Sequence, residues 1–140
     1  MKDHIPQTKK DKRATTRGNR DNTNSQGQQA EQTAEQFLRR QGLRYCSRNY
    51  RCKVGEIDLV MEDGDILVFV EVRLRSNRHF GMGAESVTWH KQQKIIRASQ
   101  HYLLRCGLLD KRPCRYDVVA LCAPDSDTDI QWLPNAFAAY

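Results

Sequence analysis

Three acidic residues lie within two adjacent segments that strongly favour β-structure. The stretch GEIDLVMEDGDILVFVEVR runs from Gly55 to Arg73 and carries Glu56, Asp58 and Glu71. Acidic residues are uncommon in strands and are rarely buried without a partner. Several carboxylates on one sheet face repel each other. A hard divalent cation such as Mg²⁺ or Mn²⁺ offsets that repulsion, because it takes carboxylate oxygens as ligands.

Arg73 follows Glu71 by two residues, so both side chains point to the same side of a strand. A cation there can contact a phosphate while a metal ion polarises the phosphoryl group. The pattern predicts metal-assisted phosphodiester hydrolysis, with Asp58, Glu71 and Arg73 as catalytic residues and the two acids as metal ligands. The alternative is a solvated face on which Arg73 and Arg75 pair with Asp58 and Glu56.

The two segments are separated by Asp63-Gly64, a dipeptide typical of a two-residue hairpin turn. This turn is expected to place Glu56 opposite Glu71. It also makes Asp58 and Glu71 diagonal neighbours, with their Cα atoms about 7–8 Å apart. Alternation along the first strand assigns one face to its acids and the other to three apolar residues, Ile57, Leu59 and Met61.

The remaining pattern supplies the elements that must position these acids. Helical spacing predicts helices over 30–41 and from Thr88, as the cap, to Gly107. Strand patterns cover 43–54, 55–62, 65–75, 114–123 and 129–133, and a Gly-containing loop covers 76–86. The order α-β-β-β-α-β-β predicts an α/β domain with a mixed central sheet flanked by helices.

The N-terminal segment has a different composition. Residues 1–29 contain one large aliphatic residue, Ile5, besides the initial Met, and no Phe, Trp or Tyr. This segment contains seven Lys and Arg residues and three Asp residues, so it carries +4 of the net charge of +6. We expect a disordered basic tail at 1–29 and a single folded domain at 30–140. Such a tail attracts polyanions, with nucleic acid first, or serves solubility alone.

The second predicted helix carries a basic stripe. Lys91 and Lys94 lie on one face with Arg97 at its border, and together with Arg75 they are the candidates for nucleic-acid contact. An ordinary solvated helix face gives the same pattern.

Compartment and membrane contact follow from what the sequence lacks. It has no apolar run of transmembrane length and no signal peptide pattern. Its five cysteines are odd in number and form no CxxC pair, which favours a reduced, cytoplasmic protein without a membrane partner.

Three stretches together resemble a known family. GEIDLVMEDGDILVFVEVRLRS, FGMGAESVTWHKQQKIIRASQHYL and RYDVVAL…IQWLPNAF are similar to the YraN-like family of uncharacterised bacterial proteins. That family resembles the restriction-endonuclease-like PD-(D/E)XK nucleases, including archaeal Holliday-junction resolvases. The resemblance implies a restriction-endonuclease-like core, with Asp58 and Glu71 as metal-binding carboxylates and Glu31 on the first helix as a third acid. It places Arg73 where the superfamily has its catalytic lysine.

The resemblance leaves the function open. Arginine stabilises phosphate charge but does not deprotonate water, so Arg73 for Lys is a real departure. The expected function is a metal-dependent nuclease acting on DNA rather than RNA. The alternatives are a nucleic-acid-binding module without turnover, and an interaction scaffold that docks through the tail. Resolvase-like proteins often form dimers, so a homodimer is a further expectation.

Overall fold

The structure, a computed structural model, describes residues 19–75, 87–126 and 129–139. It contains α1 (Asn19–Arg40), β1 (Arg44–Cys52), β2 (Gly55–Asp63), β3 (Ile66–Leu74), α2 (Trp89–Arg105), β4 (Cys114–Leu121) and β5 (Gln131–Phe137). This order confirms the predicted succession α-β-β-β-α-β-β. The loop expected at 76–86 and residues 1–18 of the expected tail lie outside the described residues, and the domain division at residue 30 stays a prediction.

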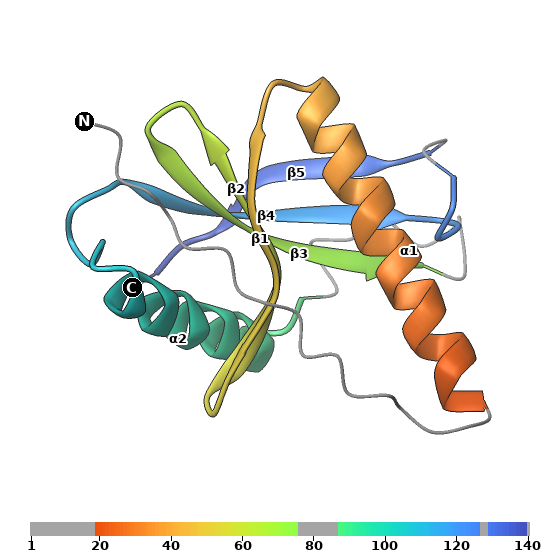
Figure 1. The fold of residues 1–140 in the computed structure, drawn as a ribbon, viewed down its shortest axis with the longest axis horizontal. Helices are drawn as coiled ribbons and strands as arrows, with labels where there is room; N and C mark the ends of the chain where they lie inside the picture. The colour runs from red at the N-terminus through yellow and green to blue at the C-terminus, as the bar shows by residue number, and fades with distance from the viewer. Residues whose placement is uncertain (1–18, 76–86, 127–128, 140) are drawn as a thin grey trace.

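The five strands form one mixed sheet in the order β1-β2-β3-β4-β5 (Figure 1). Neighbouring strands are antiparallel, except that β3 and β4 are parallel. A parallel connection needs a long crossover, and α2 supplies it between β3 and β4. The α/β fold class with a mixed sheet is therefore confirmed, and its arrangement is that expected of a restriction-endonuclease-like core.

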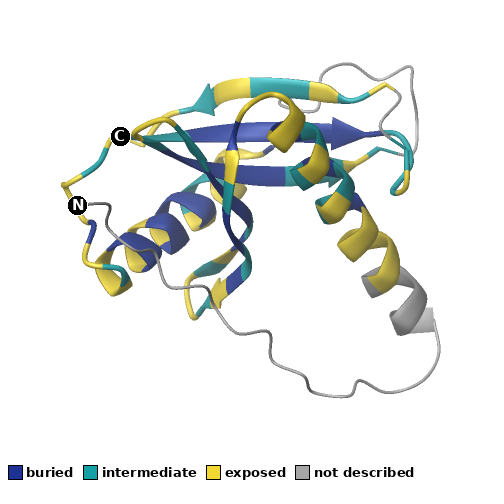
Figure 2. Cartoon of the chain, turned by 45° about the horizontal axis from the view of Figure 1, so that its top comes forward, coloured by how far each residue is buried: buried dark blue, intermediate teal, exposed yellow. Residues whose placement is uncertain are grey.

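The two helices cover opposite faces of the sheet. On the α1 face, Ala34 and Leu38 pack with Leu59, Val68 and other strand residues. On the α2 face a second apolar cluster joins the buried stripe of α2 to the alternate strand residues, among them Ile96, Tyr102, Val60, Phe69 and Val118. The central strands β3 and β4 are consequently buried over most of their length (Figure 2).

The first helix is longer than expected. It begins at Asn19 instead of Ala30 and so includes the last eleven residues of the segment for which composition predicted disorder. Residues 25–29 of this extension are exposed, whereas Ala30, Ala34 and Leu38 are buried. Once the packed part has formed, each further residue adds one hydrogen bond, which explains how a polar segment continues the helix without a core contact.

The hairpin between β2 and β3 has a different register from the expected one. Asp63 pairs with Ile66 and Leu59 with Val70, so the two turn residues are Gly64 and Asp65. Gly64 has φ +57° and Asp65 is not among the residues with positive φ. One positive φ at the first turn position is the pattern of a type II′ turn, which takes Gly there, whereas the Asp-Gly reading assumed type I′. The predicted pairing of Glu56 with Glu71 is therefore wrong.

The strand β2 also departs from regular alternation. Leu59 belongs to the α1-side cluster, as expected, but Ile57 packs in the α2-side cluster. The change falls between the pairs Arg48–Leu59 and Tyr50–Ile57, where β1 contributes Asn49 with φ +56°. Asparagine tolerates this left-handed conformation better than most residues. Because Ile57 and Leu59 pack in different clusters, the expected common face for these two residues is wrong.

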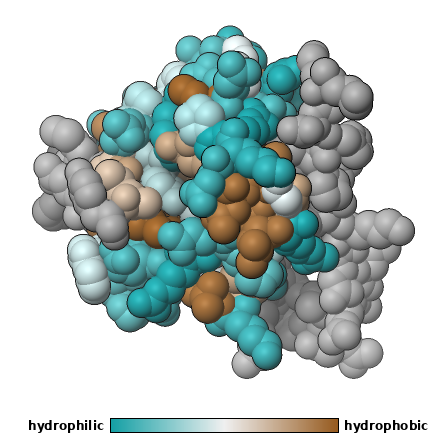
Figure 3. Space-filling model, turned by 90° about the vertical axis from the view of Figure 1, so that its left-hand side faces the viewer, coloured by the Kyte–Doolittle hydropathy of each residue, from teal (hydrophilic) through white to brown (hydrophobic). Residues whose placement is uncertain are grey.

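The molecular surface is largely hydrophilic with small apolar groups. Figure 3 shows such a group on the side of the molecule where α2 ends. The exposed large apolar residues are Val54, Leu74, Trp89, Leu104 and Leu109. Within the described residues, neither helix combines the length and the apolar character needed to cross a lipid bilayer.

Candidate functional site

Asp58 lies at the point where β2 separates from β3. The paired register of the two strands ends at Leu59 and Val70. One residue further, Oδ2 of Asp58 accepts a hydrogen bond of 2.9 Å from the backbone N–H of Val72. The side chain of Asp58 thus takes the place of a ladder carbonyl, and this bond holds its carboxyl group beside Glu71.

The carboxyl groups of Asp58 and Glu71 form a close pair. Burial raises the pKa of Asp58 well above its ordinary value, and the charge of Glu71 raises it further. A hydrogen bond between the two side chains acts in the same direction, while the N–H of Val72 opposes the shift. Glu71 itself is 5% exposed. Two carboxyls in this arrangement are destabilised when both are ionised, which is the condition that a cation relieves.

A lysine from α2 contacts Glu71, one member of this pair. The ammonium of Lys91 lies 2.8 Å from Oε1 of Glu71. Lys91 is placed by the start of α2, where the Thr88 hydroxyl accepts a bond of 3.2 Å from the Lys91 N–H. Gly55 allows the helix to approach, because a Cβ at that position would lie 2.8 Å from the carbonyl oxygen of Lys94.

The third predicted acid approaches from α1. Burial raises the pKa of Glu31, and the Asn49 side chain lowers it by hydrogen bonding. The charge of Glu31 contributes to the raised pKa of Asp58, so the two groups are electrostatic neighbours. Oε2 of Glu31 is buried without a hydrogen-bond partner among the described residues. An unsatisfied buried carboxylate oxygen is costly and is a suitable ligand for a cation.

These acids fit a small hard cation in part. Two adjacent carboxylates are a donor set that Mg²⁺ commonly uses, with waters filling its other positions. Across the described ranges, however, no three His, Cys, Asp or Glu side chains are grouped closely enough to hold an ion together. The residues that fit a metal are therefore the pair Asp58 and Glu71, with Glu31 nearby as a third acid rather than an aligned ligand.

The other predicted site residues lie around this pair. Arg73 follows on β3, is partly buried, and its side chain makes no hydrogen bond or ion pair within the described residues. Arg75 lies just past the end of β3. Glu56 is exposed and pairs with Arg51 at 3.4 Å, so the structure places it at the surface and not with Glu71. Lys94 and Arg97 are exposed on α2, as a phosphate-binding role requires and as an ordinary solvated face also gives.

Comparison with known proteins assigns the family. Residues 30–121 match the family model described as "Uncharacterised protein family UPF0102". The chain belongs to this family. A UPF0102 protein of Nitrosococcus oceani is 49% identical over 111 residues, which cover 79% of this chain and 90% of that protein. One from Legionella pneumophila is 47% identical over 117 residues, covering 84% and 98%.

A third UPF0102 protein, from Saccharophagus degradans, is 53% identical over 114 residues, covering 81% of this chain and 93% of its own. This membership confirms the YraN-like resemblance, and the matched UPF0102 segment contains Glu31, Asp58, Glu71, Arg73 and Lys91. The names of these relatives state no activity.

Sequence reasoning missed the role of Asn49. Its backbone has a left-handed φ of +56° within β1, and its side chain hydrogen-bonds to Glu31. The available signal was an asparagine within a strand pattern, because asparagine is depleted from strands and enriched in left-handed conformations.

Proposed function

We propose that this UPF0102 protein hydrolyses phosphodiester bonds in DNA with the help of a divalent cation bound by Asp58 and Glu71. The observation that carries the proposal is the paired carboxyl groups of these two residues, with the raised pKa of Asp58. A folded protein keeps such a repulsive arrangement at a cost to stability, and perturbed acids of this kind are enriched at functional sites. A cation held there would polarise a phosphoryl oxygen and lower the pKa of a bound water.

The chain's own residues would contribute charge and position. The N–H of Val72 fixes the Asp58 carboxylate at 2.9 Å. Lys91 lies against Glu71, and Arg73 follows Glu71 by two residues on β3. The two cations would stabilise the negative charge that accumulates on a phosphate during hydrolysis. Glu31 supplies a further carboxylate from α1. Arg73 occupies the β3 position at which the related nucleases have a lysine. Lys91 would supply an ammonium close to the acids from α2 instead.

A second candidate is a DNA-binding module without turnover. The ion pair between Lys91 and Glu71 favours it, because this contact already neutralises one of the two proposed metal ligands. Arg73 favours it as well, since a guanidinium is not a general base. The two candidates differ in their dependence on metal and on the acids.

The test is cleavage of duplex, single-stranded and junction DNA in Mn²⁺ or Mg²⁺ by the full chain. We expect metal-dependent cleavage by the wild type and none by Asp58→Asn or Glu71→Gln. Glu56→Gln is the matched control, because Glu56 is an exposed acid paired with Arg51 and should leave activity unchanged.

Absence of metal-dependent cleavage in the wild type, or equal cleavage by the two site variants, would refute the nuclease proposal. If DNA binding nevertheless persists, with the steep salt dependence of phosphate contacts, the binding module is the correct candidate.

A further inference from the structure

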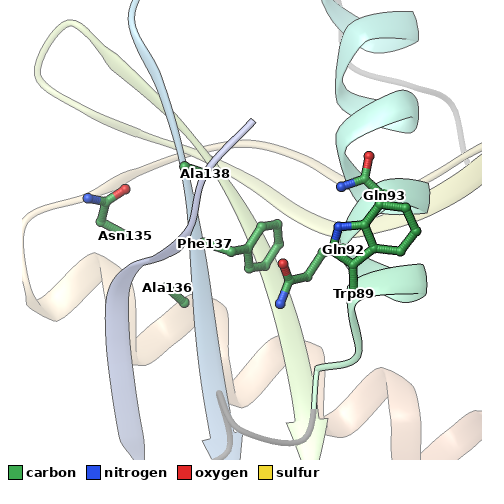
Figure 4. A pocket seen from close by; sticks show the side chains of 7 residues that line it. All are labelled: Trp89, Gln92, Gln93, Asn135, Ala136, Phe137 and Ala138. Atoms are coloured by element: carbon green, nitrogen blue, oxygen red, sulfur yellow. The ribbon is translucent and has the colours of Figure 1, made fainter. Parts of the chain in front are cut away.

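A pocket lies between the start of α2 and the end of β5. Its volume is about 740 Å³, and its lining residues are Trp89, Gln92, Gln93, Asn135, Ala136, Phe137 and Ala138. Figure 4 shows Phe137 pointing from β5 toward α2, from which Gln92 and Trp89 face it. The volume falls in the range of roughly 300–1,000 Å³ that is usual for small-ligand sites.

The lining has a consistent chemical character. All seven residues are uncharged. Trp89 is 71% exposed although it is the largest apolar side chain on this helix, which leaves its indole face available. Gln92 uses its amide to donate to the Val87 carbonyl at 3.0 Å. The amide of Gln93 makes no hydrogen bond within the described residues, and it can both donate and accept.

Contacts with β4 hold the β5 side of this pocket in place. Phe137 stacks on Tyr116, with ring centroids 5.1 Å apart. The backbone N–H of Asn135 donates to Asp117 at 2.9 Å, and Asp117 is fully buried. A wall fixed by a buried carboxylate and a ring stack is preformed, so little ordering entropy is lost when a ligand enters it.

These features select a neutral, flat ligand that has donors and acceptors along its edge. Aromatic faces stack on such a ligand, and amides read its edge. We propose that this pocket binds an unpaired nucleobase of the DNA substrate. A base inside a duplex is stacked on both sides and cannot present itself, so the pocket would favour bulged, branched or single-stranded DNA.

The position of the pocket relative to the acid pair supports this inference, which rests on the proposed function. Trp89, Gln92 and Gln93 share the first two turns of α2 with Lys91, whose ammonium contacts Glu71. The pocket and the acids are therefore on two sides of one helix, whose diameter with side chains is about 10–12 Å. Exposed Lys94 and Arg97 on the same helix offer cations to the phosphates between them.

The experiment measures binding of the full chain, in EDTA, to three DNAs of one sequence: a paired duplex, the same duplex with one bulged base, and the duplex with an abasic bulge. We expect the wild type to bind the bulged base about tenfold more tightly than the abasic bulge, in line with the usual contribution of base–aromatic stacking. Trp89→Ala and Gln93→Leu should remove this preference and leave duplex affinity unchanged. Leu104→Ala is the matched control, since Leu104 is 67% exposed on the same helix.

A second measurement follows the two indole N–H signals by NMR. The bulged base should shift the signal of Trp89 and leave that of Trp132, which donates to Asp117 at 3.0 Å, in place. Two results would overturn the pocket proposal while leaving the nuclease proposal intact. One is equal affinity of the wild type for the bulged base and the abasic bulge. The other is an equal loss of affinity for all three DNAs in Trp89→Ala. If none of the three DNAs binds in EDTA, the pocket proposal is overturned, and the cleavage assay in Mn²⁺ or Mg²⁺ decides the nuclease proposal separately.

Discussion

The ammonium of Lys91 lies 2.8 Å from the carboxylate of Glu71, although the two residues belong to a helix start and to a central strand. Glu71 also adjoins Asp58, whose pKa it raises. The carboxylate of Glu71 thus contacts both the ammonium of Lys91 and the carboxyl group of Asp58. A divalent cation that binds the two acids must compete with Lys91 for Glu71 or share it.

Replacing Lys91 by Gln is expected to weaken the fold and to strengthen metal binding. The free energy of unfolding in EDTA should fall by about 1–2 kcal/mol, between the values of exposed and buried ion pairs, because Lys91 is half exposed and Glu71 is not. Addition of Mn²⁺ should then raise Tm more in the variant than in the wild type. Thermal unfolding with and without Mn²⁺ measures both effects.

Lys94→Gln is the control for this substitution, since Lys94 is exposed one turn further along α2 and makes no ion pair within the described residues. It should change neither Tm nor the Mn²⁺ response. A smaller Mn²⁺ effect in Lys91→Gln than in the wild type would contradict competition between Lys91 and a cation.

Replacing Asp58 by Asn should stabilise the protein at neutral and alkaline pH. Because the pKa of Asp58 is higher in the folded than in the unfolded protein, the folded state is favoured below the ordinary carboxylate pKa of about 3.9, and this advantage is lost as the pH rises through the folded value. The neutral amide of the variant has no such loss, and its oxygen can still accept from Val72. The difference in unfolding free energy should grow with pH, by about 1.4 kcal/mol for each unit of the shift.

Urea unfolding in EDTA between pH 4 and pH 8 tests this expectation, with Glu56→Gln as an exposed control whose difference from the wild type should stay small. A pH-independent difference between Asp58→Asn and the wild type would show that burial and Glu71 do not raise the pKa of Asp58 in the folded protein. Addition of Mn²⁺ at high pH should reduce the difference in unfolding free energy between the variant and the wild type, because it stabilises only the wild type.

The turn between β2 and β3 shows how much of the arrangement of the acidic residues could be predicted from the sequence. The two readings of Asp63-Gly64-Asp65, with the turn at Asp-Gly or at Gly-Asp, differ in register by two residues. A shift of two preserves the face on which each side chain lies. The shared face of Val60, Phe69 and Glu71 was therefore predictable, while the partner of Asp58 was not.

The approach of Glu31 to Asp58 could not be predicted from strand alternation. Strand alternation assumes a regular backbone, whereas β1 has a left-handed turn of the backbone at Asn49, between residues that keep their register with β2. No period in the sequence reports such a turn, so the approach of Glu31 came only from the family resemblance. The contact between Lys91 and Glu71 likewise depends on how closely α2 packs on Gly55, a tertiary distance that local pattern does not contain.

Replacing Gly55 by Ala tests that packing distance. The added Cβ would lie 2.8 Å from the backbone oxygen of Lys94, so strand or helix must move, at a cost of about 1–3 kcal/mol. Gly27→Ala is the opposite case, because its Cβ meets nothing within 4 Å in α1 and should add about 0.5–1 kcal/mol of helix stability. Chemical unfolding and far-UV circular dichroism measure the two. A neutral Gly55→Ala would mean that α2 is not closely packed on β2.

Asp117 illustrates an acid that belongs to the fold and not to the chemistry. Its side chain is 0% exposed and accepts from Arg115, from Trp132 and from the backbone of Asn135. Asp117→Asn would turn an amide group toward these donors and leave Arg115 short of a partner. We expect the free energy of unfolding to fall by about 3–5 kcal/mol, the usual result of breaking a buried pair.

Asp63→Asn provides the comparison for Asp117, because Asp63 also binds Arg115, at 2.7 Å, but its side chain is 45% exposed. Its loss should cost at most about 1 kcal/mol. Urea unfolding gives both values, and near-UV circular dichroism of Trp132 reports whether β5 remains in place. Equal costs for the two variants would contradict the anchoring role of Asp117. A large cost for Asp117→Asn alone, with the Mn²⁺ response of the folded protein retained, would separate this buried acid from the pair at Asp58 and Glu71.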